Sequence, residues 1–251
     1  MSTRTKFPDV AELYHLQSSN LREVPLDMRL DLDRKPKRNR TYPGSVRTPL
    51  TGKNLDVLDA PFGTLLRERR SSREFVQRPL PFEQLGILLY ATYAIRGYEK
   101  FDGEWAGRRC VPSAGGLYPL EIYVSARNVE SLADGIYHYD ARAHELELRR
   151  AGDHHQEIAD MTIGQGMLAR ANVILIIAAN RERTMWKYGQ RGYRYVWIEA
   201  GHVGQNIYLL APALGLGAVA VGGFFVSEMD RLLQLPPEER SMYLLCIGTL
   251  S

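Results

Sequence analysis

The spacing of apolar positions predicts several elements in the middle of the chain. Apolar side chains recur at helical spacing across residues 82–95, which predicts an amphipathic helix. Residues 120–126 alternate between apolar and polar side chains, as a half-buried strand does. Two more short alternating segments, 135–139 and 145–149, are separated by a linker of hairpin length. Residues 173–179 are apolar throughout, which predicts a central strand covered on both faces.

The last third of the chain predicts a long helix followed by strands. One apolar stripe runs through residues 196–210, and Pro212 indicates where this helix ends. The other expected elements are a helix end at 65–70, a turn at 214–217, a strand at 218–221, a helix at 228–235 capped by Ser227, and a strand at 243–249. Because helices and strands do not alternate strictly, we expect an α+β fold with a central, mostly antiparallel sheet flanked by helices.

The first part of the chain differs from the rest. Residues 1–60 are rich in Pro, Lys and Arg and form a lead-in segment, whereas residues 61–251 form the folded domain. Between Arg34 and Arg47 the chain contains several basic residues and no acidic one. The whole chain, however, has 32 Lys and Arg against 29 Asp and Glu. The basic run is therefore expected to be a solvated segment and not a nucleic-acid site.

Composition narrows the class of protein. With 45% hydrophobic and 24% charged residues, the chain is globular and neither disordered nor fibrous. No charged side chain occurs from Ala200 to Ser227, but Pro212 and several glycines interrupt this stretch, so it is expected to be buried and not membrane-spanning. The chain begins without a signal-like apolar stretch, which predicts a cytoplasmic protein. Cys110 and Cys246 show neither disulfide nor metal-site spacing and are expected to be core thiols.

Arginines surround a serine shortly before the predicted 82–95 helix. Arg69, Arg70 and Arg73 flank Ser71. Guanidinium groups and a hydroxyl together can hold a phosphate, because the arginines supply charge and paired donors. A solvated basic face would have the same local pattern.

A glycine-containing loop leads directly into the predicted strand at residue 120. It contains Pro112, Ser113, Ala114, Gly115 and Gly116. Glycines allow backbone N–H groups to approach a flat ligand closely. An ordinary turn before a strand is the alternative.

Aromatic and basic residues gather in the segment 185–195. Lys187 and Tyr188 ordinarily titrate near pH 10, so either acts as a base only if its surroundings lower its pKa. The same composition suits single-stranded nucleic acid or a plain surface loop. The glycines from Gly215 to Gly223 precede a strand, whereas a dinucleotide fingerprint follows one, so a Rossmann site is not expected.

Together these segments resemble the nitroreductase-like flavoprotein family, and within it the SagB-type dehydrogenases. The matching segments are residues 14–15, 69–75, 112–119, 135–139, 186–189, 191–195, 199–206, 215–217 and 222–224. The resemblance implies an α+β homodimer that binds FMN at the subunit interface. The helix around residues 199–210 would then form much of that interface.

The resemblance also implies roles for individual residues. Arg69, Arg70, Ser71 and Arg73 match the segment that holds the flavin phosphate and ribityl chain. Pro112, Ser113, Ala114, Gly115 and Gly116 match the loop that approaches the flavin ring from the partner subunit. Val221, Gly222 and Gly223 match the strand end beside the reactive edge of the ring.

The SagB-type branch oxidises azolines to azoles in ribosomally made peptides, and its catalytic Lys-Tyr pair is matched by Lys187 and Tyr188. The expected function is therefore FMN-dependent dehydrogenation of such heterocycles, with a biosynthetic partner enzyme delivering the substrate. One alternative is an NAD(P)H-dependent nitro or quinone reductase, and another is a non-enzymatic binding or scaffold protein. No nucleic acid, membrane or metal is expected among the ligands.

Overall fold

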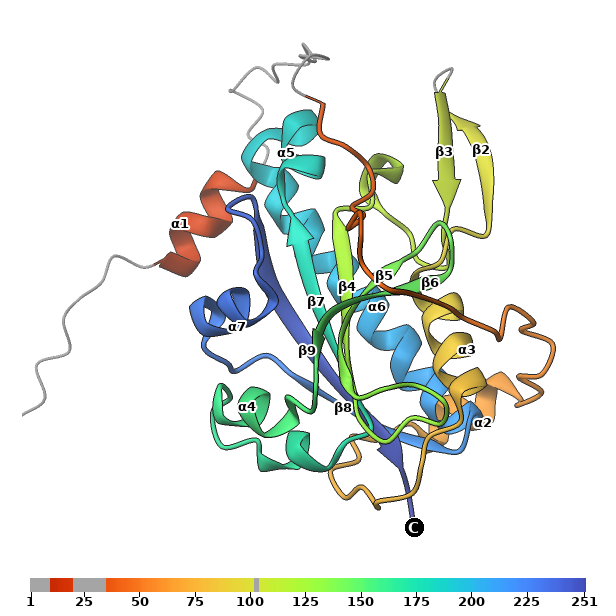
Figure 1. Ribbon diagram of the computed structural model, residues 1–251. Coiled ribbons are helices and arrows are strands. Elements are labelled where there is room, and N and C mark those ends of the chain that lie inside the picture. Colours follow the sequence, from red (N-terminus) through yellow and green to blue (C-terminus); the bar gives the residue numbers. More distant parts are fainter. Residues whose placement is uncertain (1–9, 20–34, 102–103) are drawn as a thin grey trace, which may run out of the picture.

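Seven strands pair into a central sheet in which each neighbouring pair runs antiparallel (Figure 1). The computed structural model describes residues 10–19, 35–101 and 104–251. The strands lie in the order β1 (Arg47–Pro49), β6 (Glu145–Ala151), β5 (Gly135–Asp140), β4 (Leu120–Ala126), β7 (Val173–Asn180), β9 (Glu239–Thr249) and β8 (Leu216–Val221). The predicted α+β fold with an antiparallel central sheet is confirmed.

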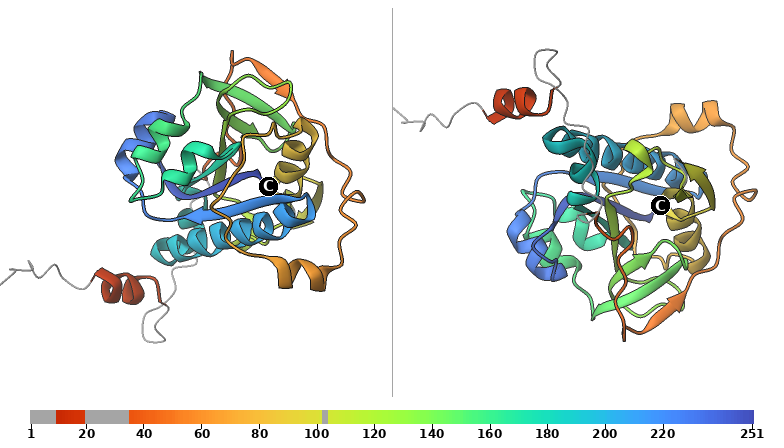
Figure 2. Two further views of the ribbon diagram at one scale, coloured as in Figure 1. Left: turned by 90° about the horizontal axis from the view of Figure 1, so that it is seen from below. Right: turned by 90° about the horizontal axis from the view of Figure 1, so that it is seen from above.

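Helices cover both faces of this sheet. One layer consists of α3 (Phe82–Tyr93) and α6 (Gly192–Ala213). The other consists of α4 (His155–Asp160), the short 3₁₀ helix η3 (Gly166–Arg170) and α7 (Val226–Leu233). Figure 2 shows α6 along one side of the sheet, with α4 and α7 on the opposite side. β7 is therefore buried along its whole length, as predicted for residues 173–179.

β4 is buried on both faces, so the expectation of a half-buried strand at residues 120–126 was wrong. Its polar side chains do not face solvent. Glu121 pairs with His138 of β5 at 2.9 Å and with Arg183 at 2.6 Å. The hydroxyl groups of Tyr123 and Tyr42 lie 2.6 Å apart. The alternation of apolar and polar residues therefore separates a hydrophobic core from a buried polar layer.

His138 lies at the centre of this polar layer. Its Nε2 contacts Glu121 at 2.9 Å, and its Nδ1 contacts Glu147 of β6 at 2.8 Å. Burial alone would lower the pKa of His138, but its hydrogen bonds to the two carboxylates raise the pKa to about 9. The ring is therefore an imidazolium that holds two buried carboxylates together. We refer to Glu121, His138 and Glu147 as the buried ion cluster.

The segment before the predicted domain crosses this polar layer and is tied to it. Arg40 donates to Glu239 of β9 at 2.5 Å, and Arg47 donates to Glu147 at 2.5 Å. The expectation of a solvated basic run was wrong for Arg40, which is half-buried against a buried carboxylate, whereas Arg47 pairs with Glu147 but remains exposed. Arg34 lies outside the described residues. β1 pairs with β6, so residues 47–49 are part of the sheet.

Most element boundaries predicted by periodicity are close to the structure, with three local exceptions. One is β9, which begins at Glu239, four residues before the strand expected at 243–249. α6 ends one residue after Pro212, as predicted. β8 begins at Leu216, inside the segment expected to be a turn. Ser227 does not cap α7, because this helix begins at Val226 without a side-chain cap. Asp230 instead accepts hydrogen bonds from Ser241, which ties α7 to β9.

Several described elements carry no clear periodic signal. A two-stranded hairpin, β2 (Gly97–Phe101) and β3 (Glu104–Arg108), projects from the body of the molecule (Figure 1). The other elements of this kind are the helices α1 (Val10–Gln17) and α5 (Glu182–Tyr188), and the 3₁₀ turns η2 (Ala114–Gly116) and η4 (Gly189–Arg191), whereas α2 (Phe62–Glu68) corresponds to the helix end expected at 65–70. Lys187 and Tyr188 therefore lie in the last turn of a helix and not in a loop.

The described residues offer neither a membrane span nor a metal site. None of the described helices has the length and apolar character needed to cross a bilayer. Nor do the described His, Cys, Asp and Glu side chains gather into a group that could hold a metal ion. Both cysteines are free thiols; Cys246 is buried as predicted, but Cys110 is only half-buried.

Candidate functional site

The first group of candidate residues lies where the chain leaves α2 and runs beside β8. Ser71 pairs with Ala218 of β8, and the N–H of the next residue donates to the Ala218 carbonyl at 2.9 Å. The Ser71 hydroxyl lies 3.0 Å from the hydroxyl of Tyr208 on α6. The Arg69 guanidinium lies 5.4 Å from the centre of the Tyr208 ring. We call Arg69, Arg70, Ser71, Arg73 and Tyr208 the arginine half-site.

The arginine half-site presents positive charge without a matching acid. Among the described residues, none of Arg69, Arg70 and Arg73 forms an ion pair with a carboxylate. Arg70 and Arg73 are exposed, and Arg69 is half-buried. Three unpaired guanidinium groups beside a hydroxyl are suited to an anion such as a phosphate.

The end of β8, the strand that runs beside Ser71, offers backbone N–H groups as further hydrogen-bond donors. Val221 is buried, and Gly222 and Gly223 follow it at the surface. Within the described chain, the N–H groups of these two glycines donate no hydrogen bond. A Cβ placed on Gly222 would meet no atom within 4 Å, so the space beside this backbone is open. Three strand positions separate Ala218 from Val221, which is about 10 Å along the strand.

The second group of candidate residues forms around the loop of residues 112–116. Gly115 has a positive φ of 61°. A Cβ at Gly115 would lie 2.7 Å from the Tyr188 hydroxyl and 3.5 Å from Nζ of Lys187. Glycine is required here for both its backbone angle and its close approach to α5. We call residues 112–116, Lys187 and Tyr188 the loop half-site.

The Lys187–Tyr188 pair sits at the end of α5, against this loop. The Tyr188 ring makes an edge contact with Tyr195 at 5.2 Å, and the Arg191 guanidinium lies 5.5 Å from its centre. Burial and the neighbouring Tyr195 raise the pKa of Tyr188, against the lowering effect of Arg191. In the protein alone, Tyr188 is therefore a neutral phenol at neutral pH and a hydrogen-bond donor.

A buried carboxyl group that the sequence analysis did not single out lies behind the loop. Glu199 of α6 is 2% exposed. The Tyr93 hydroxyl of α3 donates to Glu199 Oε1 at 2.7 Å. Burial raises the pKa of Glu199 to about 7, although the hydrogen bond from Tyr93 and the nearby Ser113 hydroxyl lower it. Its position in the apolar stripe of α6, between Val196 and Val203, was the available signal: an acid on a buried helix face.

The two half-sites remain separate within one chain. No hydrogen bond, ion pair or ring contact between described residues joins the arginine half-site to the loop half-site, but both lie along α6. Tyr208 belongs to the first, and Glu199, nine residues earlier, lies near Ser113 of the second. A rise of 1.5 Å per residue places these two positions about 13 Å apart along the helix. The structure therefore places the candidate residues in two groups and does not bring all of them into one site.

A cavity opens between the loop half-site and the β2–β3 hairpin. Its volume is about 260 Å³. The hairpin contributes two oppositely charged side chains, Glu99 and Arg108, and the loop contributes Ser113, Gly115 and Gly116. Because the loop also contacts Lys187 and Tyr188, the cavity lies next to this pair.

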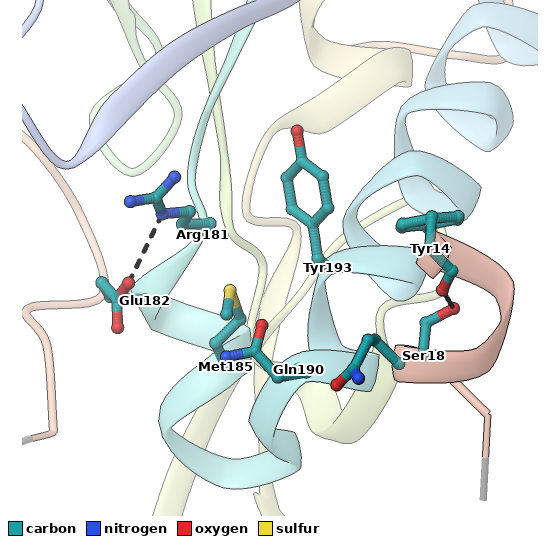
Figure 3. A pocket seen from close by; sticks show the side chains of 8 residues that line it. Tyr14, Ser18, Arg181, Glu182, Met185, Gln190 and Tyr193 are labelled. Carbon is teal, nitrogen blue, oxygen red and sulfur yellow. Dashed lines mark hydrogen bonds and ion pairs between the residues drawn. The ribbon is translucent and has the colours of Figure 1, made fainter. Parts of the chain in front are cut away.

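A separate cavity of about 410 Å³ lies on another side of α5 (Figure 3). Figure 3 shows Tyr14 and Ser18 of the α1 region opposite Met185, Gln190 and Tyr193. None of the predicted site residues lines this cavity. We therefore place the candidate chemistry at the two half-sites and not here.

Comparison with known proteins identifies the family of this chain. The model of the nitroreductase family matches residues 66–249, which include both half-sites. The chain belongs to the nitroreductase family. The resemblance seen in the sequence is confirmed, and the arginine, loop and strand-end residues all lie within the matched region.

Two curated relatives of this nitroreductase-family chain have different functional descriptions. The nitroreductase-like protein MJ1384 of Methanocaldococcus jannaschii is 39% identical over 77% of this chain and 93% of its own length. The microcin B17-processing protein McbC of Escherichia coli is 29% identical over 72% of this chain and 71% of its own length. By sequence identity, McbC is therefore the more distant of these two relatives.

Solved structures show the same fold. A nitroreductase-like protein from Anabaena variabilis matches with a TM-score of 0.74 and 23% identity, over 100% of this chain and 50% of its own. This chain thus spans half the length of that protein. A chain of the Escherichia coli microcin synthetase McbBCD complex with bound truncated pro-MccB17 matches with a TM-score of 0.60 and 20% identity, over 96% of this chain and 92% of its own.

Nitroreductase-family proteins are typically FMN-dependent oxidoreductases. The two half-sites and the end of β8 contain the kinds of chemical group that bind FMN. Arg69, Arg70 and Arg73 supply unpaired cations for a phosphate, and Gly222 and Gly223 supply unused N–H donors and open space for a ring edge.

Proposed function

We propose that this chain is an FMN-dependent dehydrogenase that oxidises azoline-type heterocycles to azoles in a peptide or natural-product intermediate. The observation that carries the proposal is the contact of Lys187 and Tyr188 with Gly115 at the centre of the loop half-site. The distant homology to McbC supports it, because that protein processes microcin B17. A reductase that takes hydride from a nicotinamide needs no base to remove a proton from a substrate carbon.

In this proposal each half-site has a distinct task. Bound FMN supplies the two-electron acceptor. Arg69, Arg70, Ser71 and Arg73 hold its phosphate and ribityl chain. The N–H groups at Gly222 and Gly223, with the loop of residues 112–116, orient its ring.

The Lys187–Tyr188 pair takes the proton from the azoline ring carbon. Loss of that proton and of a hydride converts azoline to azole, and the two electrons pass to the cofactor. Tyr188 is neutral in the resting protein, so its phenol first orients the ring nitrogen or sulfur by donating a hydrogen bond. The pair works beside the cavity lined by Glu99 and Arg108, and we assign substrate entry to this opening.

A second candidate function is an NAD(P)H-dependent nitro or quinone reductase. The observation that favours it is the 39% identity to MJ1384, a higher identity than to McbC. The two functions differ in the direction of electron flow: a reductase takes hydride from the nicotinamide, whereas the dehydrogenase takes it from the heterocycle.

Anaerobic mixing with an azoline-containing peptide or with NAD(P)H distinguishes the dehydrogenase from the reductase. The purified protein, loaded with FMN, is expected to lose its yellow absorbance when mixed with an azoline-containing peptide and to stay yellow with NADH or NADPH. An azole product with two hydrogens fewer should appear by mass spectrometry. Rapid bleaching by NADPH, with no azoline oxidation, would instead establish the reductase.

We also propose that two copies of the chain assemble around the cofactor. Trp197 and Ile198 of α6 are 44% and 49% exposed. Gly201, His202 and Gln205 continue this exposed face, and it carries no formal charge. Such a face on a central helix is suited to a second copy of itself. In a homodimer, the loop half-site of one protomer would complete the arginine half-site of its partner.

Ile198→Glu tests this assembly. Burying an unpaired carboxylate costs on the order of several kcal/mol, so dimerisation should weaken by roughly a hundredfold or more. FMN should dissociate in parallel, because each copy alone holds only the two separated half-sites. Sedimentation and FMN fluorescence measure both effects over a range of protein concentrations.

Val46→Glu is the matched control, since Val46 is 67% exposed beside β1 and not on α6. It should leave both the oligomeric state and FMN binding unchanged. A monomeric Ile198→Glu variant that still binds FMN at the wild-type affinity would contradict the shared-site assembly.

The substrate, in this proposal, is delivered by a biosynthetic partner enzyme. The structural relative in the McbBCD complex works in an assembly with a bound precursor peptide. By analogy, the β2–β3 hairpin at the cavity mouth is the place where such a delivered peptide would lie.

A further inference from the structure

Arg109 is a buried cation that the proposed chemistry does not use. It follows β3 directly and is 7% exposed. Its guanidinium lies near two tyrosine rings, 4.1 Å from the centre of Tyr93 and 5.0 Å from the centre of Tyr118. Because arginine keeps its proton in proteins, this side chain places a full positive charge inside the molecule.

The described residues do not pair this charge with an acid. Arg109 donates to the Tyr93 carbonyl at 2.8 Å and to the side-chain oxygen of Asn39 at 3.2 Å. Its Nε is buried and, within the described chain, has no hydrogen-bond partner. Among the described residues, no carboxylate forms an ion pair with Arg109. A buried charge without a counter-ion is costly, so this guanidinium is suited to an anion from outside the chain.

A small cavity lies between Arg109, the β2–β3 hairpin and the end of the 112–116 loop. Its volume is about 60 Å³, which has room for a carboxylate or a few water molecules but not for an aromatic ring. Arg38 supplies a second guanidinium to its wall, and none of its described lining residues is acidic. Tyr98 and Trp105, which are 58% and 67% exposed, line the side that reaches solvent. The charge and the size of this cavity therefore fit a carboxylate.

This small cavity adjoins the larger one that we assign to substrate entry. Gly107, Gly116 and Tyr118 line both cavities. A Cβ placed on Gly116 would meet no atom within 4 Å, so the space beside this shared backbone is open. The larger cavity contains both Glu99 and Arg108, whereas the charged residues that line the small one are all arginines. A carboxylate is therefore favoured by charge in the small cavity.

We propose that the small cavity is a carboxylate subsite, through which Arg109 and Arg38 select azoline peptides that carry a carboxylate next to the reacting ring. This inference rests on the proposed function, which places the azoline in the larger cavity. The carboxylate belongs to an acidic side chain or to the end of the peptide, and the two guanidinium groups bind it through charged hydrogen bonds. The rings of Tyr93 and Tyr118 hold the Arg109 guanidinium in place. Arg109 takes no part in proton transfer and determines specificity alone.

The expected signature is a preference among azoline peptides. The FMN-loaded protein should oxidise a peptide with glutamate next to the azoline with a kcat/KM roughly 10- to 100-fold higher than the same peptide with glutamine, the range expected for charged hydrogen bonds. The difference should appear in KM, because a group held away from the reacting atoms binds equally in the ground and transition states. A second pair of peptides, ending directly after the azoline in a free carboxylate or in a carboxamide, tests the chain end as the source of the carboxylate.

Two substitutions identify Arg109 as the residue responsible. Arg109→Gln should abolish the preference for the carboxylate-bearing peptide, whereas Arg109→Lys keeps the charge and should retain part of it. If Arg109 had only a structural role, Arg109→Gln would slow the oxidation of both peptides and leave their kcat/KM ratio unchanged. Arg96→Gln is the matched control, because Arg96 is exposed before β2 and lines neither cavity. Its kcat/KM ratio should equal that of the wild type.

A binding measurement tests the subsite without any turnover. Because the Nε–H of Arg109 is buried, it should give a resolved NMR signal in isotope-labelled protein, assigned by its loss in Arg109→Lys. Adding N-acetylglycine, which carries a carboxylate, should shift this signal until the site is saturated. N-acetylglycinamide has the same shape without the charge and should leave the signal where it is.

The outcomes separate this inference from the proposed function. Equal kcat/KM values within both peptide pairs, or a preference that survives in Arg109→Gln, overturn the carboxylate subsite while azoline oxidation stands. If no azoline peptide is oxidised, the proposed function fails together with the substrate preference, and an Arg109 signal that N-acetylglycine does not shift overturns carboxylate binding as well. If Arg109→Gln does not fold, Arg38→Gln changes the same wall and should reduce the preference, and an unchanged preference contradicts the proposal.

Discussion

Replacing Lys187 by Ala or Tyr188 by Phe is expected to slow azoline oxidation by roughly 10²- to 10⁴-fold, the range typical of general acid–base groups. Both side chains reach the loop at Gly115, beside the cavity that we assign to substrate entry. Neither belongs to the arginine half-site or the end of β8, so FMN should remain bound. Single-turnover bleaching of the flavin by substrate measures the loss directly.

A matched change on the neighbouring helix controls for general damage. Tyr193→Phe removes the same hydroxyl as Tyr188→Phe, but Tyr193 lines the cavity near α1 and not the loop half-site. Its oxidation rate should stay within about twofold of wild type. Wild-type rates in both Lys187→Ala and Tyr188→Phe, with flavin bound, would refute the dehydrogenase assignment.

Replacing His138 by Gln is expected to lower the free energy of unfolding by roughly 3 to 5 kcal/mol, because it removes one partner from a buried ion pair network. Glu121 and Glu147 would lose the imidazolium that lies 2.9 Å and 2.8 Å from them. Denaturant unfolding at pH 6 measures this effect. His154→Gln serves as the control: its pair with Glu157, also at 2.8 Å, lies near the surface and should contribute about 1 kcal/mol or less.

The free energy of unfolding should also depend on pH through the titration of His138 and Glu121. The pKa of His138 is raised from 6.5 to about 9, so its contribution is complete below about pH 6.5 and disappears as the pH rises through 9. Burial would raise the pKa of Glu121, but Arg183 and His138 lower it to about 2, so its contribution is complete above 4.5 and is lost toward pH 2. Stability from the buried ion cluster should therefore be greatest between about pH 4.5 and 6.5. A His138→Gln variant with the wild-type loss of stability from pH 6.5 to 9 would contradict this account.

Local periodicity explains which features the sequence could predict. β7 is buried on both faces and α6 carries one long apolar stripe, so their residue patterns reflect a single environment along their length. The loop of residues 112–116 and the arginines at 69–73 were also visible, because glycines and clustered cations are unusual regardless of the fold. Their order along the chain was enough to indicate the family.

Features that depend on distant partners could not be predicted in this way. Arg40 and Glu121 looked like solvent-facing charges, because their partners lie 199 and 17 positions away in Glu239 and His138. The two residues between β2 and β3 are Asp-Gly, a hairpin signal that the sequence analysis missed because the flanking residues do not alternate regularly between apolar and polar. The separation of the candidate residues into two half-sites depends on packing against α6, which no local pattern encodes.

The ion pair between Arg40 and Glu239 also constrains how the protein is made. Arg40 is synthesised 199 residues before its partner in β9. Arg47 can pair with Glu147 as soon as β6 has been made, whereas the Arg40–Glu239 pair must wait for β9. The contact between Arg40 and β9 is therefore a late step of folding during synthesis, because it joins two segments that are far apart in the chain.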